Sequence, residues 1–174
     1  TALDDIDINA QIIVSATDSA GDLLNVTLSS VNHIDVGGNI TTNNGNVSIV
    51  TSAADKRITH SAGAINAGTG SVTLRADDMT LTGTSITGNG GINIYTTTAS
   101  TIIQLDAITE VGGQLELPVA MLETLASTGT VTIGQDGFNT GVIEVNGGAA
   151  INLLGESFNL TLATDGAINN VDGG

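Results

Sequence analysis

Short alternations of apolar and polar residues recur along the chain and predict β-strands. In each triplet an apolar residue is followed by Thr, Ser or Asn and then by a second apolar residue, as in a half-buried strand. The clearest triplets are Val47-Ser48-Ile49, Val72-Thr73-Leu74, Ile92-Asn93-Ile94, Val131-Thr132-Ile133 and Ile151-Asn152-Leu153. Gly and Asn separate them, which is typical of strands joined by tight turns. Only the segment from Pro118 to Leu125 predicts a helix, of one or two turns.

The triplets form a repeat of roughly 20 residues. We place the first strand of successive units at Ile6, Val26, Val47, Val72, Ile92, Leu115, Val131 and Ile151. A second apolar pair follows in most units, at Ile34/Val36, Met79/Leu81, Ile103/Leu105, Ile143/Val145 and Leu160/Leu162. A third short element often comes next, at Ile40, Ile65, Ile86 and Ile168. Three strands in one repeat predict a coil of a single-stranded parallel β-helix, with about eight coils in the all-β chain.

The physics of such a repeat favours a β-helix over an antiparallel sandwich. A unit of this size cannot bury its own apolar face, whereas stacked coils share one core. A sandwich would show two-residue hairpins between paired strands, and here similar units follow one another in tandem. We expect residues 1–174 to form one continuous segment of a longer chain or a repeat unit of it, because neither end carries a polar capping segment.

Composition then excludes several classes of function. The 174 residues carry 18 acidic and three basic side chains, a formal charge of −15, and no Cys. A chain with this charge lacks the basic surface that nucleic acids and anionic membranes require. Without Cys it has neither disulfides nor a thiolate metal site. No apolar run approaches the roughly 20 residues of a membrane-spanning helix, so we expect no membrane insertion.

The chain resembles a known family in the cadence of its strands. The run from Gly70-Ser71-Val72-Thr73-Leu74 to Leu81-Thr82-Gly83 is similar to filamentous-haemagglutinin-type exoproteins, as is the order of Gly112-Gly113-Gln114-Leu115, Leu122-Glu123-Thr124-Leu125 and Gly129-Thr130-Val131-Thr132-Ile133-Gly134. The resemblance implies a right-handed β-helix in a large bacterial adhesin, secreted or on the cell surface, with roles in virulence and biofilm formation. It also implies export by two-partner secretion, although the family's N-terminal secretion domain is absent from this sequence.

Paired acids are the first candidates for a site. Asp77 and Asp78, and the cluster Asp4, Asp5 and Asp7, supply carboxylates, but Ca²⁺ takes six to eight oxygen ligands. Asp77 and Asp78 are therefore a weak candidate for a Ca²⁺ site, and a solvated corner between strands is the favoured interpretation. We expect no other metal or cofactor.

Catalysis is not expected from this sequence. A glycosidase needs two carboxyls across a cleft, usually with aromatic platforms, and the aromatic residues are only Tyr95, Phe138 and Phe158. A lyase acting on acidic sugars needs several basic residues, and only Lys56, Arg57 and Arg75 exist, the first two as expected loop charges. His33 and His60 lie in polar sequence without a second ligand nearby, so we expect surface histidines.

Several surface features of the sequence are candidates for binding a partner. Thr96-Thr97-Thr98 is the densest Thr cluster, but no Thr-x-Thr column recurs in every unit, as a flat face for ice or sugar would require. Asn-x-Ser/Thr glycosylation patterns begin at Asn25, Asn39, Asn46 and Asn159. We expect the shaft of an adhesin, or alternatively a filament subunit whose open ends stack on identical copies. Any host or bacterial glycan or protein would bind at the irregular segments 55–62, 96–101 or 118–125.

Overall fold

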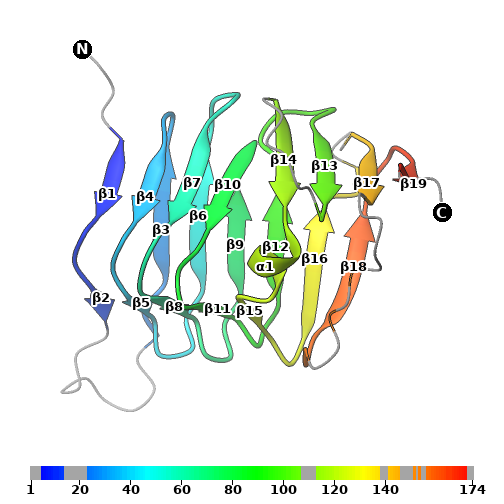
Figure 1. The fold of residues 1–174 in the computed structure, drawn as a ribbon. Helices are drawn as coiled ribbons and strands as arrows, with labels where there is room; N and C mark the ends of the chain where they lie inside the picture. The colour runs from blue at the N-terminus through cyan, green and yellow to red at the C-terminus, as the bar shows by residue number, and fades with distance from the viewer. Residues whose placement is uncertain are drawn as a thin grey trace.

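The structure is a parallel β-helix (Figure 1). It is a computed structural model, and it describes residues 5–13, 23–106, 113–137, 141–145, 151, 153 and 156–171. Every strand pair among these residues is parallel, so none of them forms a hairpin. The paired strands come from successive coils, except β13 and β14, which follow one another in the same coil. The predicted fold class is therefore confirmed, and the sandwich is excluded.

Three walls enclose the core, and the chain visits them in turn. The first wall is a six-stranded sheet in the spatial order β18-β16-β12-β9-β6-β3. Its strands are β3 (Val26–Ser30), β6 (Val47–Thr51), β9 (Val72–Arg75), β12 (Ile92–Tyr95), β16 (Thr130–Gly134) and β18 (Asn159–Ala163). Each of these strands belongs to a different coil, so the strand order of this sheet gives the order of the coils along the axis.

The second wall consists of two four-stranded sheets. The N-terminal one contains β1 (Ile6–Ile8), β4 (Ile34–Val36), β7 (Arg57–His60) and β10 (Asp78–Leu81). The C-terminal one contains β14 (Gln114–Leu117), β13 (Ile102–Leu105), β17 (Ile143–Val145) and β19 (Ile168–Asn170). Strands β10 and β14 lie in contact, so the two sheets follow one another along the same side of the helix.

The third wall is a five-stranded sheet of short strands. Its members are β2 (Ile12–Ile13), β5 (Ile40–Thr41), β8 (Ala64–Asn66), β11 (Ser85–Thr87) and β15 (Leu125–Ala126). In the described part of the chain, one helix, α1 (Val119–Leu122), joins β14 to β15 and places Met121 and Leu122 in the core. The helix predicted after Pro118 is thus confirmed, with Pro118 at its N-cap.

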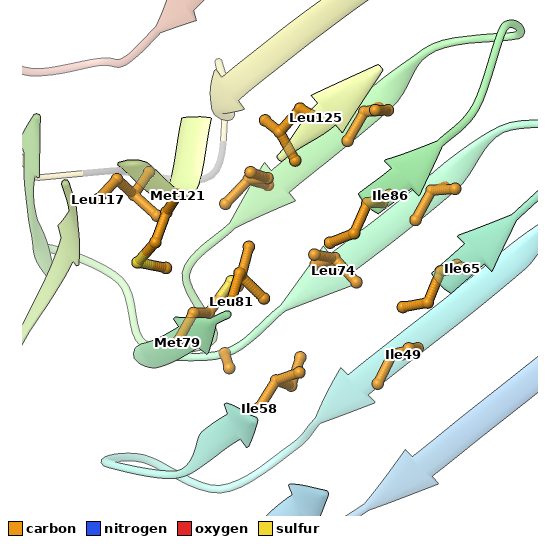
Figure 2. Close-up of a cluster of buried hydrophobic side chains, with 14 of the residues drawn as sticks. Ile49, Ile58, Ile65, Leu74, Met79, Leu81, Ile86, Leu117, Met121 and Leu125 are labelled. Carbon is orange, nitrogen blue, oxygen red and sulfur yellow. The ribbon is translucent and has the colours of Figure 1, made fainter. Parts of the chain in front are cut away.

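Aliphatic columns fill the interior. In the five-stranded sheet, strand pairing stacks Ile40, Ile65, Ile86 and Leu125 directly above one another, and all four are buried. Figure 2 shows side chains from all three walls and from α1 converging on this interior, including Ile49, Ile58, Leu74, Met79 and Leu81. Fully burying one such side chain contributes about 1.5–3 kcal/mol, so the shared core is the main source of stability.

The coils are less regular than the repeat predicts. Ile92 pairs with Val131, so a single coil takes in both the predicted unit at Ile92 and the one at Leu115. Strand β14 lies beside β13 in the same sheet, with Leu115 opposite Ile103, and therefore Leu115 does not begin a coil. The chain passes along this wall twice before α1 takes it to the next wall. The segment 107–112 between the two strands lies outside the described residues.

Other assignments at the two ends are also wrong. Ile6 pairs with Ile34 and so belongs to the second wall, and Leu160 pairs with Val131 and so belongs to the first. Ile168 pairs with Ile143 in the second wall, and Ile151 lies in no strand. The longest sheet of the described chain thus has six strands, fewer than the roughly eight coils of about 20 residues that the repeat predicts. An apolar triplet alone does not specify which wall it enters, because loops of different lengths precede it.

Candidate functional site

Asp77 lies at the corner between β9 and β10 and is buried, with 2% of its surface exposed. Asp78 begins β10 and is only partly buried. Consecutive residues of a strand point to opposite faces, and the burial alternates accordingly through Asp77, Asp78 and Met79. The two acids that are adjacent in sequence therefore do not converge on one site.

The Asp77 carboxylate joins the turns of three successive coils. Its Oδ1 accepts the backbone N–H groups of Thr97 and Thr98, each at 2.7 Å. Its Oδ2 accepts the backbone N–H of Asp55 at 3.1 Å and the hydroxyl of Thr98. Asp55 follows β6, and the threonines follow β12. Two of the irregular segments expected to bind a partner, 55–62 and 96–101, thus meet at one carboxylate.

These hydrogen bonds give Asp77 a structural role at the corner. Each carboxylate oxygen already receives two hydrogen bonds, and charge-assisted bonds of this kind are stronger than neutral ones. A cation would have to replace those donors before it could bind. In the part of the chain that the structure describes, no three or more His, Asp or Glu side chains are grouped so that they could hold a metal ion.

The Thr cluster folds into the same corner. The Thr97 hydroxyl donates to the carbonyl of Thr51 at 2.8 Å, and Thr96 is buried with no hydrogen-bond partner for its hydroxyl. The Arg75 side chain donates to the carbonyls of Thr96 and Thr97 at 3.4 and 3.5 Å. These contacts link three coils. Thr96 is buried, Thr97 is partly buried and Thr98 is exposed, so the cluster does not form one flat outer face.

A hydrogen-bonded row crosses the N-terminal four-stranded sheet at the start of its strands. Asp5 Oδ1 accepts the backbone N–H of His33 at 3.3 Å, and His33 Nδ1 accepts the backbone N–H of Arg57 at 3.0 Å. A ring nitrogen that accepts a hydrogen bond carries no proton, so this contact requires the tautomer protonated at Nε2. Arg57 then lies opposite Asp78. Arg57 is therefore the first residue of a strand, and its assignment to a loop was wrong.

His60 differs most from the expectation of a surface histidine. It ends β7 with 1% of its surface exposed, and neither ring nitrogen has a hydrogen-bond partner. Burial lowers the pKa of His60 below its ordinary value of 6.5 because the charged ring would lose its hydration; the nearby backbone of Gly63 opposes this shift in part. The other candidate histidine, His33, directly precedes β4 and is partly buried.

One uncharged polar column runs along the outer face of the six-stranded sheet. Strand pairing aligns Thr27, Ser48, Thr73, Asn93, Thr132 and Thr161. The neighbouring outward column begins Ser29, Val50, Arg75 and Tyr95. The statement that no Thr-x-Thr pattern recurs in every coil is therefore confirmed.

Asparagines at several corners connect one coil to the next. The Oδ1 atom of Asn25 accepts the backbone N–H of Asn46 at 2.8 Å, and that of Asn46 accepts the backbone N–H of Ser71 at 2.9 Å. Asn39, Asn44 and Asn89 make the same contact with Ala64, Thr69 and Thr128. Three of the four Asn-x-Ser/Thr patterns thus begin at an asparagine that holds two coils together. Their shared position just before a strand was the signal in the sequence for this role.

Comparison with protein families, curated proteins and solved structures gave no significant match. Within the described ranges, no helix has the length and hydropathy that crossing a membrane would need.

Proposed function

We propose that this chain is a non-catalytic shaft segment of a bacterial adhesin that is secreted or displayed on the cell surface. The observation that carries the proposal is the unbroken pairing of the six-stranded sheet, in which each of the strands from β3 to β18 aligns residue by residue with the next. A shaft must transmit force along its axis, and this sheet supplies backbone hydrogen bonds between all of its coils.

Side-chain contacts also connect successive coils along the axis of the β-helix. Asp77 bridges three coils, and the asparagine contacts bridge pairs of coils at the corners. Together with the aliphatic columns, these contacts resist both the separation and the sliding of coils. The charge of −15 gives neighbouring rods a like charge, which limits lateral association.

The adhesin context comes from the resemblance to filamentous-haemagglutinin-type exoproteins. That resemblance also supports an extracellular location, right-handed winding and two-partner secretion. The partners of this segment would be the neighbouring coils of its parent chain, while host or bacterial glycans or proteins would bind a region that the shaft holds away from the cell.

A surface-display experiment tests the shaft. The chain is placed on bacteria between a membrane anchor and a sugar-binding domain of known specificity, and capture of sugar-coated beads is measured. The matched control replaces the chain with a flexible Gly/Ser linker of equal length. We expect better capture with the chain than with the linker, and no capture by the chain without the sugar-binding domain. Equal capture with the flexible linker would contradict a stiff shaft, and capture by the chain alone would mean a binding module.

One observation favours the alternative of a filament subunit. Among the residues that the structure describes, the large apolar side chains that are more than a third exposed lie at the two ends of the helix: Ile13, Leu23 and Val31 at one end, and Leu160, Ile168 and Val171 at the other. A neighbouring copy could cover them by adding a coil. Sedimentation velocity over a wide concentration range distinguishes the two: a monomer throughout supports the shaft segment, and rods that lengthen with concentration support the filament.

A further inference from the structure

His60 occupies a position in the core where the neighbouring coils place aliphatic residues. Strand pairing aligns it with Val36 on one side and Leu81 on the other, and Val36 in turn with Ile8. Val36 and Leu81 are buried, as is His60 itself. The column is therefore apolar except for one imidazole ring.

The ring is enclosed, and neither ring nitrogen is hydrogen-bonded, although the backbone of Gly63 lies nearby. A Cβ atom on Gly83 would lie 2.2 Å from Cε1 of His60, so the backbone of Gly83 packs directly against the ring. The backbone of the site is tightly bonded as well, since the carbonyl of His60 accepts the N–H groups of Thr82 and Gly83, each at 2.8 Å. Both ring nitrogens are nevertheless unpaired. An unpaired polar group in a core costs about 1–3 kcal/mol, and an unpaired charge costs more.

Among the described residues, no charged group lies in the core beside the ring to compensate a proton. The inward residues of β4 and β10 are Ile34, Val36, Met79 and Leu81, and those of β6, which also packs against β7, are Val47, Ile49 and Thr51. The ionisable residues on these strands and on β7 are Asp35, Arg57 and Asp78, and all three occupy outward positions. The buried acids of the described chain are Asp77 and Glu116. Neither lies beside His60, because Asp77 is at the opposite end of the strands and Glu116 is on β14.

We propose that His60 makes the N-terminal half of the β-helix acid-sensitive: the neutral ring fills the core, and the protonated ring leaves it, opening the ends of β4, β7 and β10. The C-terminal coils, from β16 onward, have no histidine in their described residues and stay closed. The segment would thus loosen locally on acidification while the rest of the shaft stays intact. This inference does not depend on the chain being part of an adhesin.

The direction of the effect follows from proton linkage. Burial lowers the pKa of His60 in the closed state, whereas in an open state the ring titrates near 6.5. The contribution of the neutral ring is therefore fully present above pH 6.5 and is lost as the pH falls below it. Since one proton is taken up on opening, the opening equilibrium rises up to about tenfold per pH unit in that range.

Amide hydrogen exchange of the full chain between pH 7.5 and pH 5 tests the proposal, after correction for the intrinsic pH dependence of exchange. We expect the protected amides of β4, β7 and β10 to open up to about tenfold more per pH unit below 6.5, and those of β16 and β18 to stay constant. His60→Leu should remove this dependence, and His33→Gln should retain it. The proposal would be overturned if amide exchange in β4, β7 and β10 did not depend on pH in the wild type. It would also be overturned if that exchange depended on pH equally strongly in His60→Leu.

A second measurement covers the case in which His60→Leu does not fold. The ring protons of His60 are followed by NMR in His33→Gln, where His60 is the only histidine. We expect a titration midpoint below 6.5, with exchange broadening of the signals of β4 and β10 in the same range. A midpoint at or above 6.5 in the folded chain would show that the closed core tolerates the charged ring, and would contradict the proposal.

Discussion

The backbone N–H of Thr98 donates to the Oδ1 atom of Asp77 at 2.7 Å, although 21 residues separate the two in the sequence. That separation is one coil, so the contact fixes how one coil stacks on the next. The Thr98 hydroxyl adds a bond to the other carboxylate oxygen, and Asp55 reaches the same oxygen from the coil on the opposite side. A single buried carboxylate therefore holds a corner that spans three coils.

Removing this carboxylate should destabilise the chain. We expect Asp77→Ala to lower the free energy of unfolding by about 3 kcal/mol, because three backbone N–H groups lose their acceptor at a partly buried corner. Asp77→Asn, which keeps one acceptor oxygen, should lose about half as much. Urea denaturation measures both. Asp78→Asn is the control, with an expected loss below about 1 kcal/mol; similar losses for Asp77→Asn and Asp78→Asn would contradict the special role of Asp77.

Close stacking of the corners predicts a second effect. A Cβ atom at Gly70 would lie 2.2 Å from the carbonyl oxygen of Gly45 in the preceding coil, and the backbone there cannot move without separating the coils. Gly70→Ala should therefore destabilise the chain by about 3 kcal/mol. At Gly37 the nearest atom would be 3.5 Å away, an ordinary contact. Thermal unfolding should show little change for Gly37→Ala, and an equally mild Gly70→Ala would argue against close stacking.

The asparagine contacts between coils can be tested with a matched pair. Asn46 accepts the backbone N–H of Ser71 and also its hydroxyl, at 2.9 and 3.0 Å. Asn46→Ala should cost about 1–2 kcal/mol of unfolding free energy. Asn93 lies on the outer face of β12, and Asn93→Ala should cost less than about 0.5 kcal/mol. Equal costs, measured by urea denaturation, would mean that the corner asparagines add nothing to coil stacking.

Tyr95 provides a test at alkaline pH. Burial raises the pKa of Tyr95 above its ordinary value of 10.0, and the chain has no other tyrosine. Ultraviolet absorbance of tyrosinate should give a midpoint above 10 in the folded chain and near 10 in urea. Because the folded chain retains the proton longer, the contribution of Tyr95 to stability is present below pH 10 and is lost above it. Tyr95→Phe should lack that alkaline loss, and a folded midpoint at or below 10 would contradict the partial burial of the ring.

The candidate site was only partly predictable from the sequence. The segments 55–62 and 96–101 stand out because they interrupt the repeat, but their meeting at Asp77 depends on the stacking of three coils. The Asp77-Asp78 pair suggests one shared site, whereas the strand directs the two side chains apart. His60 lies between Thr59 and Ser61, so its immediate neighbours in the sequence indicate a polar surface position. Only its alignment with Val36 and Leu81 places it in the core.

The sequence by itself determined the strands, the apolar interior and the parallel β-helix, because those depend on local alternation and on a repeat too short to form its own core. The tertiary structure decided which wall each strand enters. Val72 and Leu115 begin similar triplets, but one starts a coil and the other adds a strand beside β13. The difference arises because the wall that a strand joins is set by the length and path of the preceding turn and by the edge that the previous coil leaves open. Both of these are relationships between residues a full coil apart, and the local pattern does not contain them.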